Sequence, residues 1–263
     1  MREFCFKLFA DTYFGTGARI EAFSKYHLIY AILIAGAITA VHLLVKNRAA
    51  EAKVKCLRVV AYLLCFSYIG DFFVHEFAYP ELDGLNMDKL PFHICTVLCP
   101  LVALAQFNHN GRKIIEPVTV MAIVGPLMYL CYPASLGNAE PWCYRSVQTM
   151  FYHGTLLAWG VLNLTLGLVR LNKCNLWHVG VLLICITLWA KLGSVLMDQN
   201  WFFLKEDAFY LGLVEKGVIP QWSLMIINPL CCFGVAAVIY GLYGMAEHAR
   251  AHRAAMRAAC CCV

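Results

Sequence analysis

The chain has 263 residues, of which 61% are hydrophobic and 14% charged, and its formal net charge is +5. Soluble domains carry about 25% charged residues, so this composition excludes a soluble single domain and a disordered chain. The apolar runs approach the length of a bilayer-spanning helix, about 20 residues. They also exclude an outer-membrane barrel, in which strands of about 10 residues alternate apolar and polar positions.

Seven apolar runs predict an all-α fold, a polytopic membrane helix bundle with seven transmembrane helices. They lie at 26–45, 59–78, 90–107, 114–132, 147–169, 176–197 and 222–244. Prolines interrupt the third and fourth runs, which membrane helices tolerate when neighbouring helices satisfy the freed carbonyls. We therefore expect an interfacial amino-terminal segment at 1–25, one transmembrane domain at 26–244, and a basic, cysteine-rich cytosolic tail at 245–263.

The charges in the loops predict the orientation of the bundle. The loops on one side, together with the carboxyl-terminal tail, contain twelve basic and two acidic residues, whereas the opposite side contains eight basic and eleven acidic residues. Lysine and arginine are retained on the cytoplasmic side of a membrane. We expect the amino end outside and the carboxyl end in the cytosol. This topology accounts for the basic residues without a nucleic-acid partner.

Polar side chains from five of the predicted spans fall at a similar depth. An ionisable group inside a membrane is by default a hypothesis about function. On straight helices that rise about 1.5 Å per residue, most of these groups lie roughly 5–10 Å below the outer boundary. They are Asp71 and His75 in the second span, His93 and Cys95 in the third, His153 in the fifth, Lys191 in the sixth and Asn228 in the seventh.

Two pairs within this layer have helical spacing. Asp71 and His75 are four residues apart and share a helix face, so the carboxylate either orients the imidazole or forms a structural pair with it. Lys191 shares a face with Asp198, and it either pairs with Asp198 or extends its amino group towards the membrane surface.

The other members of the layer also have two interpretations each. His93 and Cys95 are two residues apart, so a regular helix points them about 200° from each other, and we expect only one of them to enter a given pocket. Cys95 and His153 also suit buried packing positions. Asn228 could instead cover a kink at Pro229.

Three stretches resemble a known family. Residues 90–95 read Leu-Pro-Phe-His-Ile-Cys, which resembles the L-P-x-H-x-C signature of the YwaF-like integral membrane family. Residues 23–27, which open the first span, and residues 200–204, which follow the sixth, also resemble that family. The resemblance covers roughly 23–244, and Trp201-Phe202 replace the Tyr-Met that is usual in the family.

This family is similar to the eukaryotic transmembrane-protein-164 acyltransferases, which move fatty acyl groups onto ether lysophospholipids with a cysteine and a histidine inside the membrane. The resemblance implies that Cys95 is a nucleophile and His153 its base. It implies phospholipid or lysophospholipid as the substrate partner, with no cofactor and no metal. The expected supporting polar residues are Asp71, His75, His93, Lys191 and Asn228.

The sequence therefore leaves three hypotheses about function. The main prediction is an intramembrane acyltransferase, or lipid ester hydrolase, that forms an acyl-thioester. A zinc-dependent hydrolase would use Asp71, His75, His93 and His153 as ligands, although no ligand motif supports it. A non-enzymatic transporter or binding protein is the third, although transporters usually show internal repeats and none is apparent.

Overall fold

The computed structural model describes residues 20–78, 90–131, 136, 139–205 and 213–260, and only the backbone of 75–78, 254–255 and 257–260. Within these residues all regular structure is helical, and the seven predicted helices are confirmed. They are α2 Lys25–Val45, α3 Ala50–Ala78, α4 Ile94–Phe107, α5 Ile115–Cys131, α6 Tyr144–Thr165, α7 Leu176–Met197 and α8 Leu224–Cys260. Short 3-10 helices are η2 Asn110–Ile114, η4 Lys173–Asn175, η5 Trp201–Phe203 and η6 Gln221–Ser223.

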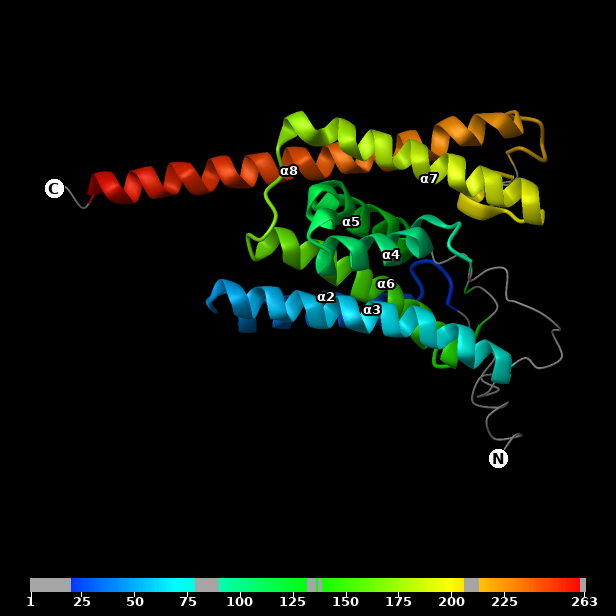
Figure 1. The fold of residues 1–263 in the computed structure, drawn as a ribbon, viewed down its shortest axis with the longest axis horizontal. Helices are drawn as coiled ribbons and strands as arrows, with labels where there is room; N and C mark the ends of the chain where they lie inside the picture. The colour runs from blue at the N-terminus through cyan, green and yellow to red at the C-terminus, as the bar shows by residue number, and fades with distance from the viewer. Residues whose placement is uncertain (1–19, 79–89, 132–135, 137–138, 206–212, 261–263) are drawn as a thin grey trace.

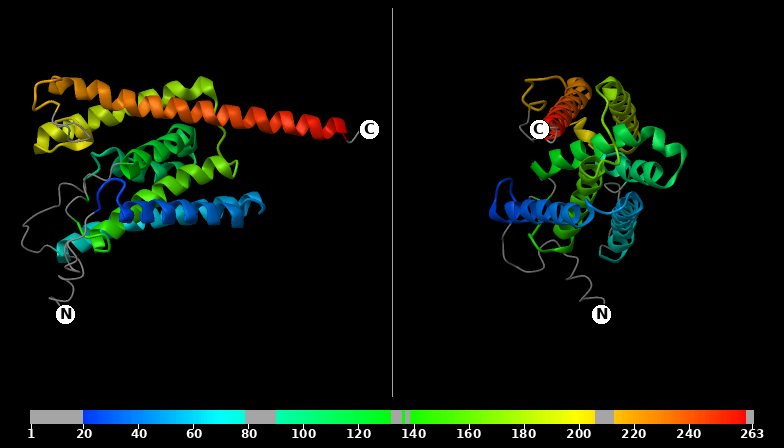
Figure 2. Two further views of the ribbon diagram at one scale, coloured as in Figure 1. Left: turned by 180° about the vertical axis from the view of Figure 1, so that it is seen from behind. Right: turned by 90° about the vertical axis from the view of Figure 1, so that its left-hand side faces the viewer.

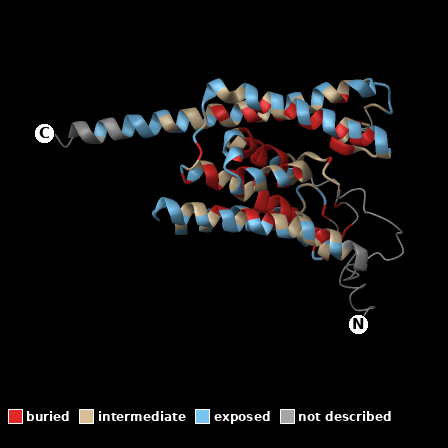
Figure 3. Cartoon of the chain, viewed as in Figure 1, coloured by how far each residue is buried: buried red, intermediate tan, exposed pale blue. Residues whose placement is uncertain are grey.

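The seven helices form three groups that lie side by side (Figures 1 and 2). Helices α4, α5 and α6 occupy the middle, with α2 and α3 on one side and α7 and α8 on the other. Buried residues concentrate in the middle group and on the faces turned towards it (Figure 3). The outer helices expose large apolar side chains such as Phe66, Leu188 and Leu230, which suits a lipid environment.

Five of the described helices are long and apolar enough to cross a membrane, namely α2, α3, α5, α7 and α8. Helix α4 has only 14 residues, about 21 Å, which is shorter than a bilayer core of about 30 Å. Helix α6 is long enough but more polar, and it buries Ser146, His153, Thr155 and Asn163. It can carry these groups because other helices, rather than lipid, surround it. The chain is therefore a multi-pass integral membrane protein.

Several predicted helix boundaries are wrong by a few residues or more. Helix α4 begins at Ile94 rather than 90, because the backbone of His93 is extended (φ −77°, ψ 151°). Helix α6 ends at Thr165 rather than 169, because Gly167 adopts a positive φ of 73°. Helix α3 begins at Ala50 rather than 59, because charged helical turns precede its apolar part.

The carboxyl-terminal segment is also mostly helical. Helix α8 continues to Cys260 and projects beyond the bundle (Figures 1 and 2), so the residues expected to form a separate tail prolong the last span. Most of the predicted interfacial segment 1–25 lies outside the described residues. Which end faces the cytosol stays a prediction.

Gly193 permits a close contact between α7 and the segment that precedes α4. A Cβ added at this position would lie 2.4 Å from a ring carbon of Phe92, closer than two carbons can approach. We expect Gly193→Ala to destabilise the protein by about 1–3 kcal/mol, measured as a lower Tm in detergent. Gly234→Ala is the matched control, because no atom lies within 4 Å of its added Cβ. Equal Tm values for the two variants would contradict this packing.

Candidate active site

Cys95 lies in the first turn of α4, directly after the extended residue His93 and the first helical residue, Ile94. Its side chain is buried, and its sulfur faces α5, where a Cβ added at Gly125 would lie 3.3 Å from the sulfur. The Cys95 carbonyl accepts a hydrogen bond of 2.7 Å from the Tyr152 hydroxyl of α6. Backbone N–H groups in the first turn of a helix favour negative charge, whereas burial among apolar groups opposes formation of a thiolate, so the thiol needs a base to take its proton.

His153 is buried in α6 in a defined tautomer. Its Nδ1 lies 2.8 Å from the carbonyl oxygen of Thr149. Because a carbonyl only accepts, Nδ1 carries the hydrogen and Nε2 keeps a lone pair. The ring stacks on Tyr129 of α5, with 3.8 Å between ring centroids and 10° between planes. The stacking and the Thr149 bond together fix the direction of the basic nitrogen.

Cys95 and His153 contact neighbouring residues of α5 and α6. Gly125 and Tyr129 are four residues apart and therefore share one face of α5, about 6 Å apart along its axis. The Cys95 sulfur faces Gly125, and the His153 ring covers Tyr129. Tyr152, the residue before His153, binds the Cys95 carbonyl. In the described part of the chain no hydrogen bond joins the thiol to the imidazole.

His93 contacts η5, the 3-10 turn that follows α7. The Phe202 N–H donates to His93 Nδ1 at 3.3 Å, and the His93 ring lies 6.0 Å from that of Phe203. The expectation that His93 and Cys95 point in opposite directions assumed that both lie on one regular helix. That assumption is wrong, because His93 precedes α4. Its direction is set by η5 instead.

Asn228 holds the same turn from α8. Its side-chain amide donates to the carbonyl oxygens of Phe202 and Phe203, each at 2.9 Å. Both phenylalanines have positive φ, 53° and 54°, a conformation that costs about 1–3 kcal/mol per non-glycine residue and persists only when surrounding contacts enforce it. Two residues of the predicted layer, His93 and Asn228, therefore come together at η5.

The predicted pair of Asp71 and His75 stays a prediction, because the side chain of His75 lies outside the described residues. Asp71 is buried in α3 and hydrogen-bonds to Tyr144, at the start of α6. This contact joins α3 to α6.

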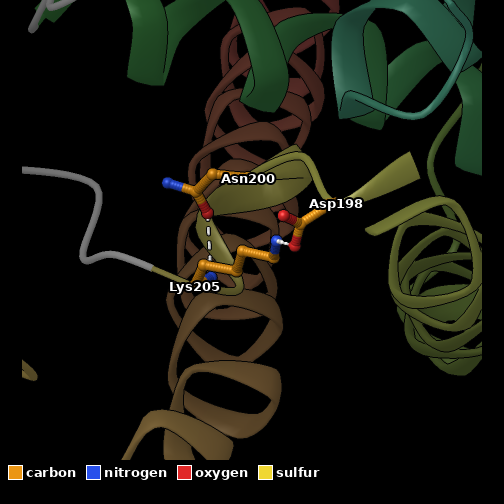
Figure 4. Close-up of polar contacts among 3 residues, drawn as sticks. All are labelled: Asp198, Asn200 and Lys205. Carbon is orange, nitrogen blue, oxygen red and sulfur yellow. Dashed lines mark hydrogen bonds and ion pairs between the residues drawn. The ribbon is translucent and has the colours of Figure 1, made fainter. Parts of the chain in front are cut away.

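Of the two interpretations of Lys191, the one in which it pairs with Asp198 is not what the structure shows. Asp198 ends α7 with a left-handed φ of 55°, which removes it from the helical register that it would share with Lys191. Its carboxylate pairs with Lys205 instead, and the Lys205 backbone N–H donates to Asn200 Oδ1 at 2.8 Å (Figure 4). Lys191 stays half-buried on α7.

The Asp198–Lys205 pair should make η5 sensitive to acid. The hydrogen bond and the charge of Lys205 hold the pKa of the exposed Asp198 carboxyl below its ordinary value of 3.8. A carboxyl with a lowered folded-state pKa stabilises the fold above its unfolded-state pKa, and this contribution is lost as the pH falls through the folded-state value.

We therefore expect Asp198→Asn, which keeps a residue that tolerates positive φ, to lower the Tm slightly at pH 7 and by progressively less as the pH falls below 3.8. The effect is small because the pair is exposed. Tm measured for both proteins from pH 7 into the acid range tests the pair. A Tm difference that does not shrink on acidification would show that charge is not its cause.

No three His, Cys, Asp or Glu residues among those that the structure describes are placed to share a metal ion. The described members of the proposed zinc set, Asp71, His93 and His153, contact different partners: Tyr144, Phe202 and Thr149. These three residues do not form a shared ligand set, and the side chain of His75, the fourth proposed ligand, lies outside the described residues.

The surroundings of Cys95 and His153 include contacts that could not be predicted from the sequence. Tyr152, Tyr129 and Gly125 place Cys95 and His153 relative to α5 and α6. The only available signal was the position of Tyr152 beside His153.

A model of the TMEM164 family matches residues 22–242. No curated protein and no solved structure is significantly similar to the chain. The match includes all the predicted site residues, and it confirms the resemblance to the transmembrane-protein-164 relatives. It does not test the more specific likeness to the YwaF-like proteins.

Proposed function

Because the chain belongs to the TMEM164 family, we propose that it is an intramembrane lipid acyltransferase that works through an acyl-thioester on Cys95. The observation that carries the proposal is the tautomer of His153: its Nδ1–H donates to the Thr149 carbonyl, so the lone pair of the neutral ring is on Nε2. A histidine with one nitrogen oriented by an acceptor and the other basic is the arrangement that activates nucleophiles in hydrolytic enzymes. Here the acceptor that orients the imidazole is a backbone carbonyl, that of Thr149.

In the first half of the reaction, the Cys95 sulfur attacks the ester carbonyl carbon of a phospholipid while His153 Nε2 accepts the thiol proton. The tetrahedral intermediate collapses by breaking the bond between the acyl carbon and the ester oxygen. His153 returns its proton to that oxygen, and a lysophospholipid leaves. The acyl group remains on Cys95 as a thioester.

In the second half, His153 Nε2 accepts the hydroxyl proton of a lysophospholipid as its oxygen attacks the thioester carbonyl. The carbon–sulfur bond breaks, the thiolate regains the proton from His153, and a new phospholipid leaves. With water as the acceptor the same steps release a fatty acid. Burial of both residues supports transfer over hydrolysis, because exclusion of water suppresses the competing reaction.

Trapping the thioester tests the proposal. The purified protein is incubated with a phospholipid that carries a labelled acyl chain, denatured in acid and digested. We expect label on the peptide that contains Cys95, and its release by neutral hydroxylamine. In Cys95→Ser any label should be an oxyester, which resists this treatment. Lipid turnover without labelled protein would reject the intermediate, and saturable lipid binding without turnover would identify a binding protein instead.

A further inference from the structure

Two cysteine thiols from neighbouring helices lie in contact near the proposed active site. Cys65 belongs to α3 and Cys99 to α4, and the two thiols hydrogen-bond to each other. Cys99 lies one helical turn after Cys95 on the same helix. The acyl transfer proposed above uses neither Cys65 nor Cys99, so the pair has no role in that reaction.

Contacts on either side of the two cysteines show how α3 packs against α4. Tyr62 of α3 contacts Phe107 of α4, with 4.6 Å between ring centroids. Tyr68 of α3 contacts the ring of Tyr152 at 6.0 Å, and the Tyr152 hydroxyl donates to the Cys95 carbonyl of α4. The earlier residue of α3 therefore faces the later residue of α4, which makes the two helices antiparallel.

This register brings Cys65 and Cys99 to the same level of the bundle. Cys65 is three residues from each of the two α3 tyrosines, and Cys99 lies between the two α4 residues that these tyrosines face. The packing of the helices thus places the two thiols opposite each other independently of their hydrogen bond. Sulfurs that already touch across a helix interface need only a small side-chain movement to form a disulfide bond of about 2.05 Å.

The two cysteines differ in their exposure. Cys65 is partly exposed, whereas Cys99 is buried. Tyr62 and Phe66, which flank Cys65 on α3, are exposed at the surface of the bundle, so a small oxidant can reach the Cys65 sulfur from this side. Redox-sensitive cysteines commonly combine an accessible thiol, which meets the oxidant, with a neighbouring thiol that resolves the product. Cys65 and Cys99 have this arrangement.

We propose that Cys65 and Cys99 form a disulfide when a peroxide reaches the protein. With hydrogen peroxide, the Cys65 sulfur attacks one oxygen, the O–O bond breaks, and the thiol proton leaves with the other oxygen as water. Cys65 is then a sulfenic acid. The Cys99 sulfur attacks the Cys65 sulfur, the S–O bond breaks, and the Cys99 proton leaves with the hydroxyl group as a second water. The two sulfurs together lose two electrons, which reduce the peroxide.

The disulfide would tie α3 to α4 one turn from the proposed nucleophile. Cys95 is not the expected partner of either thiol, because its sulfur faces Gly125 of α5 and because it shares one helix with Cys99. Since neither Cys65 nor Cys99 takes part in acyl transfer, formation of this bond does not depend on the proposed function.

The test maps disulfides in the full-length protein. The protein is purified in detergent with a reductant, which is then removed, and hydrogen peroxide is added until Cys174, exposed on η4, is oxidised. Remaining thiols are blocked, and chymotrypsin, which cleaves after leucine, separates Cys95 from Cys99 at Leu98. We expect a linked pair of peptides that contain Cys65 and Cys99. The pair should be lighter than the two reduced peptides by two hydrogen atoms, and dithiothreitol should separate it.

Cys56→Ser is the matched control for Cys65→Ser, because Cys56 is also a partly exposed cysteine of α3. The Cys56→Ser protein should keep the linked pair, whereas the Cys65→Ser protein should lose it. A wild-type protein that forms no bond between Cys65 and Cys99 while Cys174 is oxidised would overturn the proposal. So would a disulfide that joins Cys65 or Cys99 to any other cysteine.

Discussion

Cys95→Ala should abolish acyl transfer while the protein stays folded, which is among the largest changes expected from any single substitution. The thiol supplies the bond that carries the acyl group, and alanine offers no replacement. Loss of one buried sulfur costs at most a few kcal/mol of stability. Lipid transfer assayed in detergent, with Tm measured on the same samples, separates loss of chemistry from loss of folding.

Two other buried cysteines serve as controls for this substitution. Cys99 lies one turn further along α4, and Cys232 is buried in α8. Cys99→Ala and Cys232→Ala remove the same sulfur from the same core, so they should lower the Tm to a similar extent and leave the transfer rate per folded molecule largely unchanged. Full activity in Cys95→Ala would end the thioester mechanism.

Replacing His153 by asparagine or glutamine should reduce kcat by about 10²–10⁴-fold, the usual contribution of a general base. Asparagine can still donate to the Thr149 carbonyl in place of Nδ1, and glutamine extends an amide towards the position of Nε2, but neither accepts a proton near neutral pH. If His153 were a structural residue, asparagine would restore activity by restoring the Thr149 bond. Rates measured for both variants at saturating lipid distinguish these roles.

His27 is the matched histidine control. It is also buried, but both of its nitrogens have structural bonds, Nδ1 accepting from the Phe23 N–H and Nε2 donating to the Leu130 carbonyl. His27→Asn should lower the Tm and leave kcat per folded molecule nearly unchanged. Combined with Cys95→Ala, substitution of His153 should add little further loss, since residues that act as a unit are not additive.

The helices were predictable because their cause is local in sequence. A run of about 20 apolar residues has few alternatives in a membrane, and α2 and α7 match the predicted ranges closely. The start of α4 was missed because the extended conformation of His93 depends on its contacts with η5, which is more than 100 residues away.

The predicted polar layer divides into separate groups for a similar reason. Equal depth on straight helices says nothing about which faces meet, and Asp71 and Asn228 turn towards Tyr144 and η5. Turn η5 could not be anticipated, because phenylalanine at positive φ is rare and only tertiary contacts maintain it. Cys95 and His153 were selected by family resemblance, whereas the Thr149 carbonyl that orients His153 is visible only in the structure.

The polarity of α6 has a consequence for how the protein enters the membrane. A helix with buried Ser146, His153, Thr155 and Asn163 partitions poorly into lipid by itself, since polar residues at the centre of a span oppose insertion by the translocon. Helices α3 and α5, its principal contacts, precede α6 in the chain, so they are already synthesised when α6 reaches the insertion machinery. We therefore expect the insertion of α6, the helix that carries the proposed base, to depend on these two earlier helices, which cover its polar side chains.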